Sequence, residues 1–346
     1  MTTTEPDAAP GVTAASPITV PGNRYPTGWF QVGWSDEIGP GETRLVHYFG
    51  RDIVLWRGES GALKAADAYC LHLGANLGVG GCVQGEEIVC PWHGWQWDGE
   101  GRNTHIPFSS QSCKPHLRLE VWTVEERYGV ILLWHDRAGG GPTWEPPTLQ
   151  PLEDGSTFPI TPGMRRSERV KAHPQMPSEN GVDANHLVFI HGAGLPPTFD
   201  EVVADGHRWT TRLTAYYGAG KDGSWLTPEG AMKLHLQFTL WGIGLGVAIW
   251  PPDLMGGFMI TNVTPVDDTL SEIFWCMTTR REPGDGDEMG PAGQKFIEHQ
   301  WRTVTQDFFI WEHMKTLHTP NFTVEEAKYY AMLRRWAWQF YPQVAE

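Results

Sequence analysis

The chain has 346 residues, 40% of them hydrophobic, and a formal net charge of −15 at pH 7. This acidic balance argues against a nucleic-acid-binding protein, because contacts to phosphate need a basic surface. No segment approaches the roughly 18 consecutive apolar residues of a membrane-spanning helix, so we expect a cytoplasmic globular protein, with two domains at this length.

The N-terminal part of the chain is predicted to be a tail followed by an all-β domain. Residues 1–22 are rich in Thr, Ala and Pro and have neither a basic start nor an apolar run, so we expect a disordered tail rather than a secretory signal. Residues 23–140 contain short β-branched strands separated by Gly-rich turns, which predicts β structure. The Gly- and Pro-rich stretch at residues 137–155 is the best candidate for a linker.

Residues 141–346 are expected to form a second domain that combines strands with helices, so the predicted fold class is α+β. Residues 180–192 have a helical pattern that ends at a glycine. A long helix is expected over residues 291–318, because apolar residues recur there at alternating steps of four and three. Its apolar face consists of Ile297, Trp301, Val304, Phe308 and Trp311. Strands are expected at residues 207–218, 231–242, 257–266 and 270–281.

Two loops of the first domain each contain one cysteine and one histidine. Cys70-x-His72 is followed, after 17 residues, by Cys90-x-x-His93. Two Cys and two His can bind zinc tetrahedrally, but zinc fingers usually keep like ligands together. One ligand of each kind per loop suits a [2Fe–2S] cluster with a Cys pair on one iron and a His pair on the other, which transfers single electrons.

The pattern Cys70-x-His72…Cys90-Pro-Trp-His93 resembles the Rieske proteins. This resemblance implies that these four residues hold a Rieske [2Fe–2S] cluster. In one respect the chain departs from the family, which often has Arg after the first cysteine. Here that position is Leu71, which leaves the reduction potential of the cluster open.

A second group of metal-binding residue types lies in the second domain. His186 and His191 are five residues apart, which on an ideal helix separates them by about 140°. They converge only if the helix widens or ends between them. Asp183 is three residues before His186, so on a helix these two share a face. Taken alone, the pattern fits a metal site and an ordinary helix end equally well, but two His and one carboxylate form the facial triad of non-haem Fe(II).

The third ligand of such a triad must come from further along the chain. Asp307 and Glu312 are the candidates on the long helix, and both lie at the edges of its apolar face, so periodicity does not rank them. The polar pair Glu179-Asn180 also precedes the histidines, with Asn180 three residues before Asp183.

The pattern Glu179-Asn180-x-x-Asp183-x-x-His186-x-x-x-x-His191 resembles the iron motif of the oxygenase large subunit of Rieske non-haem iron oxygenases. The resemblance implies that His186 and His191 bind iron, with Asp307 as the third ligand because the family has an Asp in a context like "QDFFIWE". It also implies catalytic roles for Asn180 and Asp183. Asp183 would link His186 to a cluster histidine, His72 or His93, of a neighbouring subunit, which predicts a homotrimer.

Within this family, the stretches "DAYCLHLGANL", "CPWHGWQWDGEGR" and "NVTPVDD" are similar to the steroid-acting branch, which contains 3-ketosteroid 9α-hydroxylase and sterol 7-desaturase. The resemblance implies an N-terminal Rieske domain and a C-terminal catalytic domain with an antiparallel sheet and a long helix, of the helix-grip (START-like) type. The stretch "GAGLPPTFD" after His191 differs from the steroid enzymes, so the residues of the substrate pocket stay open.

The family implies a monooxygenase that uses O2 and electrons from NAD(P)H to hydroxylate a C–H bond of a hydrophobic substrate, such as a steroid or another polycyclic compound. A separate flavin and iron–sulfur reductase would deliver the electrons, with or without a ferredoxin, because the chain has no Gly-rich nucleotide motif. Three alternatives remain at this stage: a desaturase or tailoring enzyme on the same scaffold, an electron-transfer Rieske protein without oxygenase activity, and a zinc-binding module.

Overall fold

The computed structural model describes residues 19–22, 24–217, 232–251, 256–282, 284–317 and 319–341. The chain forms two compact units, one of residues 29–146 with 264–268, and one of residues 1–28, 147–263 and 269–346. We call them the first and the second unit. Most of the expected tail, residues 1–18, lies outside the described residues. Of the helices that are described, none is long and apolar enough to cross a membrane.

The first unit is built from three small β-sheets, as expected of an all-β domain. Their strand orders are β1-β11-β10, β2-β3-β4-β9 and β5-β6-β7-β8. The strands are β1 (Gly28–Trp34), β2 (Thr43–Tyr48), β3 (Arg51–Arg57), β4 (Leu63–Asp67), β5 (Cys82–Gln84), β6 (Glu87–Val89), β7 (Gln96–Trp97), β8 (Asn103–His105), β9 (Val121–Trp122), β10 (Val124–Arg127) and β11 (Val130–His135).

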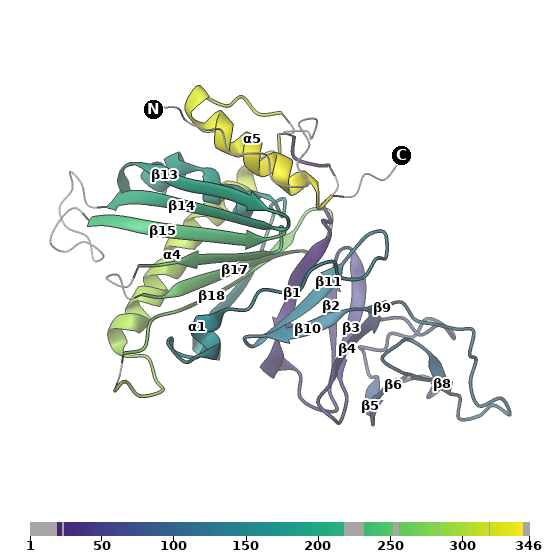
Figure 1. Ribbon diagram of the computed structural model, residues 1–346. Coiled ribbons are helices and arrows are strands. Elements are labelled where there is room, and N and C mark those ends of the chain that lie inside the picture. The colour runs from purple at the N-terminus through teal and green to yellow at the C-terminus, as the bar shows by residue number, and fades with distance from the viewer. Residues whose placement is uncertain are drawn as a thin grey trace. The chain divides into compact units, whose positions relative to one another are not determined.

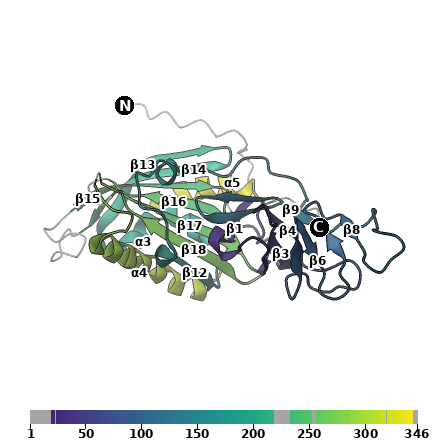
Figure 2. The ribbon, with the colours of Figure 1, turned by 90° about the horizontal axis from the view of Figure 1, so that it is seen from below.

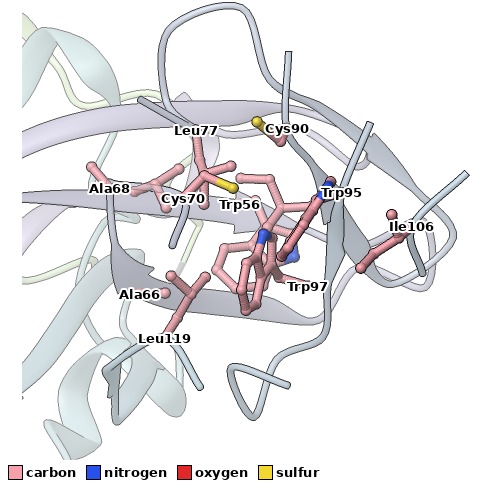
Figure 3. Close-up of a cluster of buried hydrophobic side chains, with 12 residues drawn as sticks. Trp56, Ala66, Ala68, Cys70, Leu77, Cys90, Trp95, Trp97, Ile106 and Leu119 are labelled. Carbon is pink, nitrogen blue, oxygen red and sulfur yellow. The ribbon is translucent and has the colours of Figure 1, made fainter. Parts of the chain in front are cut away.

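A buried cluster in the first unit contains two of the predicted ligands. Trp56 and Trp97 are fully buried at its centre, and Cys70 and Cys90 are 1% and 3% exposed. Figure 3 shows the two thiols within this cluster of aromatic and aliphatic side chains. Apolar surroundings exclude water from both sulfur atoms, which matters for the chemistry that thiols at this position can support.

The second unit is a seven-stranded sheet with helices around it (Figure 1), which confirms the α+β fold class. Its strand order is β12-β18-β17-β16-β15-β14-β13. The strands are β12 (Arg165–Val170), β13 (Ala193–Asp205), β14 (Arg208–Tyr217), β15 (Met232–Trp241), β16 (Leu245–Ile249), β17 (Phe258–Pro265) and β18 (Ser271–Thr278). The helices are α1 (Gln150–Glu153), α2 (Met176–Glu179), α3 (Ala184–Phe189), α4 (Pro291–His313) and α5 (Val324–Trp338).

Helix α4 runs along one face of this sheet (Figures 1 and 2) and buries the apolar face that its sequence pattern predicts. Ile297 packs against Trp275 of β18. Further along the helix, Phe308 and Trp311 pack against Ile273 of the same strand. The helix ends at His313 rather than at residue 318, because the apolar face stops at Trp311 and the next turn has nothing to bury. The backbone then becomes extended, with φ −87° and ψ 147° at residue 314.

The expected helix over residues 180–192 is interrupted. A 3₁₀ turn covers Asn180–Val182, Asp183 is extended with φ −95° and ψ 95°, and α3 begins only at Ala184. The side chain of Asp183 caps the new helix by accepting hydrogen bonds from two backbone N–H groups, and a capping residue must leave the helical conformation. Asp183 therefore does not share a helical face with His186, contrary to the sequence-based expectation.

Several elements of the second unit were not expected from the sequence, among them β13 and α5. Strand β13 contains Pro196 and Pro197, residues that normally argue against a strand. It lies at the edge of the sheet and has irregular register there, so the missing N–H groups leave no partner unpaired. Helix α5 packs Leu333 and Trp336 against Val182, beside the predicted iron motif.

Candidate metal centres

The two Cys/His loops of the first unit share one backbone design. In each loop the cysteine N–H donates to the carbonyl five residues later, Ala75 for Cys70 and Trp95 for Cys90, at 2.9 and 2.8 Å. The carbonyl of each cysteine in turn accepts from the glycine four residues later. These glycines, Gly74 and Gly94, have φ of +78° and +68°, which favours glycine at both positions. The two loops therefore present their ligands in the same local geometry.

The four side chains of these loops converge. The rings of His72 and His93 lie 4.8 Å apart between centroids, and His72 stacks on Trp95 at 4.5 Å. Burial and the neighbouring Cys90 raise the pKa of Cys70 to about 11, although a hydrogen bond from the backbone of His72 lowers it. Nδ1 of His72 is buried and has no hydrogen-bond partner within the described ranges. A buried imidazole nitrogen without a partner and two dry thiols suit metal ligation, which stabilises thiolates directly.

A second convergence occurs in the second unit, where α3 and α4 meet. One donor atom from each of His186, His191 and Asp307 lies within 4.8 Å of the others. Nε2 of His191 is 3.3 Å from Oδ1 of Asp307. The histidines can approach each other because α3 ends at Phe189, between them, which is one of the two solutions that their spacing allows. The rival carboxylate, Glu312, is exposed to solvent.

In both histidines of this group, Nδ1 makes a hydrogen bond that orients the ring. Nδ1 of His186 donates to the carbonyl oxygen of Asp183 at 2.6 Å, and Nδ1 of His191 donates to Oε1 of Gln306 at 3.1 Å. Because both partners are acceptors, each Nδ1 carries the proton and each Nε2 keeps a free lone pair. This tautomer is the one that a metal at Nε2 requires, and the second-sphere acceptors fix the ring orientations.

Asp307 is 7% exposed and is oriented by an amide from the other side of the site. Nδ2 of Asn180 donates to its Oδ2 at 2.8 Å, which leaves Oδ1 for the side of His191. Burial lowers the pKa of His191, but the hydrogen bond and charge of Asp307 more than offset this, so the pKa lies above its ordinary value. The three side chains thus form one electrostatically coupled group, which fits a divalent metal.

The carboxylate of Asp183 lies at the start of α3, with Oδ2 3.9 Å from Nδ1 of His186. It accepts from the backbone N–H groups of Asn185 and His186 at 3.0 and 3.1 Å. The hydroxyl of Tyr330 in α5 also helps to lower the pKa of this carboxyl group. Although burial raises the pKa of Asp183, these hydrogen bonds and His186 keep it below its ordinary value. Asp183 therefore holds a negative charge on a side chain that is still 26% exposed.

Helix α5 contributes residues that the sequence analysis did not single out. Arg334, 5% exposed, binds both carboxylate oxygens of Glu179 at 2.8 and 3.0 Å. This ion pair links α5 to the segment that contains Asn180 and Asp183 and stabilises its position. A sequence signal for the helix exists, because Thr323 and Glu326 form a capping box at its start, but nothing local indicates the ion pair.

The histidine and carboxylate group lies on the wall of a cavity in the second unit. The cavity wall includes His186, His191 and Asp307. Most other lining residues are apolar. Leu187 and Phe238 line it, whereas Phe189 is 83% exposed to solvent. A mostly apolar cavity with a few polar groups is typical of a site for a hydrophobic small molecule.

The chain matches two family models. Residues 28–123 match the Rieske [2Fe–2S] domain, and residues 133–341 match the 3-ketosteroid 9α-hydroxylase C-terminal domain. The chain is 28% identical to a cholesterol 7-desaturase of Hemicentrotus pulcherrimus, over 92% of this chain and 70% of that protein. It is also 28% identical to the oxygenase component of a 3-ketosteroid-9-alpha-monooxygenase of Rhodococcus rhodochrous, over 92% of this chain and 84% of that protein.

Solved structures with the same fold include NdmB of Pseudomonas putida CBB5 and dicamba monooxygenase. The first has a TM-score of 0.70 at 19% identity and covers 93% of each chain. The second has a TM-score of 0.68 at 15% identity and covers 93% of this chain and 96% of that one. These structures confirm the fold, whereas the family matches and the curated relatives confirm the resemblance, the enzyme class and the predicted Rieske [2Fe–2S] cluster. The group of His186, His191 and Asp307 fits the predicted mononuclear non-haem iron.

Proposed function

This chain belongs to the 3-ketosteroid 9α-hydroxylase family of Rieske oxygenases, and we propose that it hydroxylates an unactivated C–H bond of a hydrophobic polycyclic substrate with O2. The observation that carries the proposal is the position of the His186, His191 and Asp307 group on the wall of a mostly apolar cavity. A substrate in this cavity would lie directly beside the metal.

We assign the cluster to Cys70, His72, Cys90 and His93, where it supplies single electrons. The residues around the cluster orient one of its ligands and exclude water from the site. Trp95 stacks on the His72 ring and holds its plane, and the apolar cluster around Cys70 and Cys90 keeps water from the sulfur atoms. Two neutral imidazoles in place of two thiolates reduce the negative charge of the centre, which favours the reduced state.

We assign the iron to His186, His191 and Asp307, where it supplies a site for O2 activation. Asp183 and Gln306 keep the protons of the two imidazoles on Nδ1, so that each Nε2 is available. Asn180 holds one oxygen of Asp307 and thereby leaves the other for the metal. The apolar cavity wall excludes bulk water, which protects the substrate carbon and the metal from side reactions.

We further propose that Asp183 of one subunit faces His72 or His93 of a neighbouring subunit in a homotrimer. Two features support this arrangement. Asp183 is negatively charged and partly exposed, so it can accept a hydrogen bond from an imidazole. Large apolar side chains around the cluster loops are exposed to solvent and suit burial against protein. They are Leu71 (47%), Leu73 (60%), Trp92 (61%) and Phe108 (65%).

The electrons are proposed to come from NAD(P)H through a separate flavin and iron–sulfur reductase, with or without a ferredoxin, in the cytoplasm. The relatives of Rhodococcus rhodochrous are named as oxygenase components, and a carbazole 1,9a-dioxygenase of the same fold was solved in complex with its ferredoxin. Both names imply a partner that delivers electrons.

A desaturase remains the second candidate, because the identity to the cholesterol 7-desaturase equals that to the monooxygenase component. Turnover with ¹⁸O2, NADH and a surrogate reductase over a panel of steroids and terpenoids separates the two. Hydroxylation places ¹⁸O in the product, whereas desaturation yields an unlabelled alkene. Substrate-independent reduction of the cluster without any O2 uptake would instead indicate an electron-transfer protein and contradict both.

A further inference from the structure

Two tryptophans beside the proposed cluster ligands have indole N–H groups without a partner. Trp95 and Trp97 are 4% and 0% exposed, and both belong to the buried cluster that contains Cys70 and Cys90 (Figure 3). Nε1 of each indole is buried and has no hydrogen-bond partner within the described ranges. An indole N–H can only donate, and buried donors nearly always have an acceptor. Two unpaired donors in one dry cluster therefore require an explanation.

Both indoles come from the hairpin that carries the second Cys/His loop. Trp95 directly precedes β7, and Trp97 is the last residue of this strand. Side chains two positions apart on extended backbone point to the same side, so both enter the cluster. Gln96 between them donates from its amide to Oε1 of Gln84 at 3.0 Å. The N–H of Cys90 donates to the carbonyl of Trp95, which ties the loop to this strand.

The two indoles face different ligands. The ring of Trp95 stacks on that of His72 at 4.5 Å and an angle of 6°, so Trp95 already orients a histidine. Trp97 acts on a cysteine instead. Burial raises the pKa of the Cys70 thiol to about 11, and the backbone of His72 and the side chain of Trp97 are the groups that lower it. A group that lowers this pKa stabilises the thiolate, so the indole dipole of Trp97 is oriented towards the Cys70 sulfur.

A third tryptophan of the same cluster shows the ordinary arrangement. Trp56 is also 0% exposed, but its Nε1 donates to the carbonyl oxygen of Glu86 at 3.1 Å. Burial in this cluster therefore does not by itself leave an indole N–H unpaired. Trp97 has no such carbonyl among the described residues. The sulfur ligand of a bound cluster is the acceptor that its surroundings offer.

A hydrogen bond to a cluster sulfur has a defined effect on the cluster. Reduction adds one negative charge to the centre, and a donor binds the more negative state more strongly. Hydrogen bonds to the sulfur atoms therefore raise the reduction potential. The position after the first cluster cysteine, where the family often has Arg, is Leu71 and supplies no positive charge. A buried N–H group can supply part of this stabilisation from the other loop.

We propose that the indole N–H of Trp97 donates a hydrogen bond to the Cys70 sulfur of the bound cluster and thereby raises the reduction potential of the cluster. The inference rests on the proposed assignment of the cluster to Cys70, His72, Cys90 and His93. Trp97 is a positioning residue, because it binds neither iron nor substrate and acts through Cys70.

The test measures the reduction potential of the purified holoprotein by titration with dithionite, followed by the circular dichroism of the cluster. Trp97→Phe removes the N–H and keeps a buried aromatic ring. We expect the equilibrium to shift about tenfold towards the oxidised cluster, the size of one net hydrogen bond, which equals a potential lower by about 59 mV. Water that enters the space left by the smaller ring would favour the more charged reduced state and raise the potential, so the direction of the shift identifies its cause.

Trp56→Phe is the matched control. It makes the same change at a fully buried tryptophan of the same cluster, whose N–H bonds to a backbone carbonyl, and its potential should stay at the wild-type value. A second Trp97 variant carries 3-benzothienylalanine, which keeps the size of the ring and replaces only the N–H by sulfur. It should reproduce the lower potential, and it decides the question if Trp97→Phe assembles no cluster.

The hydrogen bond is refuted if both Trp97 variants keep the potential at or above its wild-type value, or if Trp56→Phe lowers it equally. The same measurements separate this inference from the cluster assignment. A wild-type protein without a [2Fe–2S] cluster refutes both. A cluster that Cys90→Ser abolishes, with an unchanged potential in both Trp97 variants, supports the assignment and refutes the hydrogen bond alone.

Discussion

Asn180 donates a hydrogen bond from Nδ2 to Oδ2 of Asp307 at 2.8 Å, although 127 residues separate the two in the sequence. The bond fixes which oxygen of the buried carboxylate is available beside His191. It joins the short helical segment with the histidines to the long helix with the carboxylate. The proposed iron site therefore depends on a contact that no local sequence pattern reports.

Replacing Asn180 by Leu should weaken iron binding without unfolding the protein. The variant leaves Oδ2 of Asp307 without its donor, and loss of such an outer partner typically costs 10–100-fold in metal affinity. The measurement is iron content after dialysis against graded concentrations of a chelator. Asn185→Ala is the control, since Asn185 contributes only its backbone N–H to the Asp183 cap. Equal iron retention in both variants would contradict the role of Asn180.

Gln306→Leu should have a similar effect through His191. The histidine loses the acceptor for its Nδ1 proton, so its tautomer and ring orientation are no longer held. We expect a decrease in iron affinity of about 10–100-fold. Gln306→Glu retains an acceptor oxygen at the same position and should recover most of the affinity. The role fails if Leu and Glu behave alike in a chelator competition assay.

Asp183→Ala should leave cluster and iron in place but stop turnover. The cap of α3 is lost, which costs about 1 kcal/mol of stability, too little to unfold the domain. Because neither metal uses the Asp183 carboxylate as a ligand in our assignment, the visible absorption of the cluster and the iron content should match those of wild type. Iron loss, or retained product formation, would show that Asp183 does not carry electrons between subunits.

Arg334→Met should destabilise the second unit strongly. It leaves Glu179 as an unpaired buried charge, for which losses of about 3–5 kcal/mol are typical. The double variant Arg334→Met with Glu179→Gln removes both charges and should recover a large part of that loss. Thermal unfolding monitored by circular dichroism measures both, and equal destabilisation of the single and double variants would argue against the ion pair.

Cys90→Ser should remove the cluster, whereas Cys82→Ser should not. Cys90 lies in the buried cluster of the first unit, while Cys82 is exposed on β5. Wild type and Cys82→Ser should be brown and show a rhombic low-temperature EPR signal after reduction with dithionite. A colourless wild-type protein with stoichiometric zinc would contradict the assignment of the cluster ligands.

The sequence predicted best what is local. Each Cys/His loop is a few residues long, so spacing alone brought its ligands together. The spacing of His186 and His191 required a helix that either widens or ends between them, and α3 does end there. In contrast, helical periodicity put both Asp307 and Glu312 at the edge of the apolar face and could not choose between them. In the structure Asp307 is buried and Glu312 is exposed, a difference that depends on how the helix packs against the sheet.

What the sequence could not predict depends on long-range contacts. The pair of Glu179 and Arg334 spans 155 residues, and its partners belong to different helices.

The shared backbone design of the two Cys/His loops has a mechanical consequence. In our assignment each loop gives its cysteine to one iron and its histidine to the other, so the bound cluster cross-links the loops through both metal atoms. Without it, the ring of His72 still contacts the rings of His93 and Trp95 in the other loop. Loss of the cluster should therefore make the two Cys/His loops more mobile and more sensitive to proteases, while the β-sheets of the first unit stay folded. Oxidative damage to the cluster would thus cause a local unfolding of these loops.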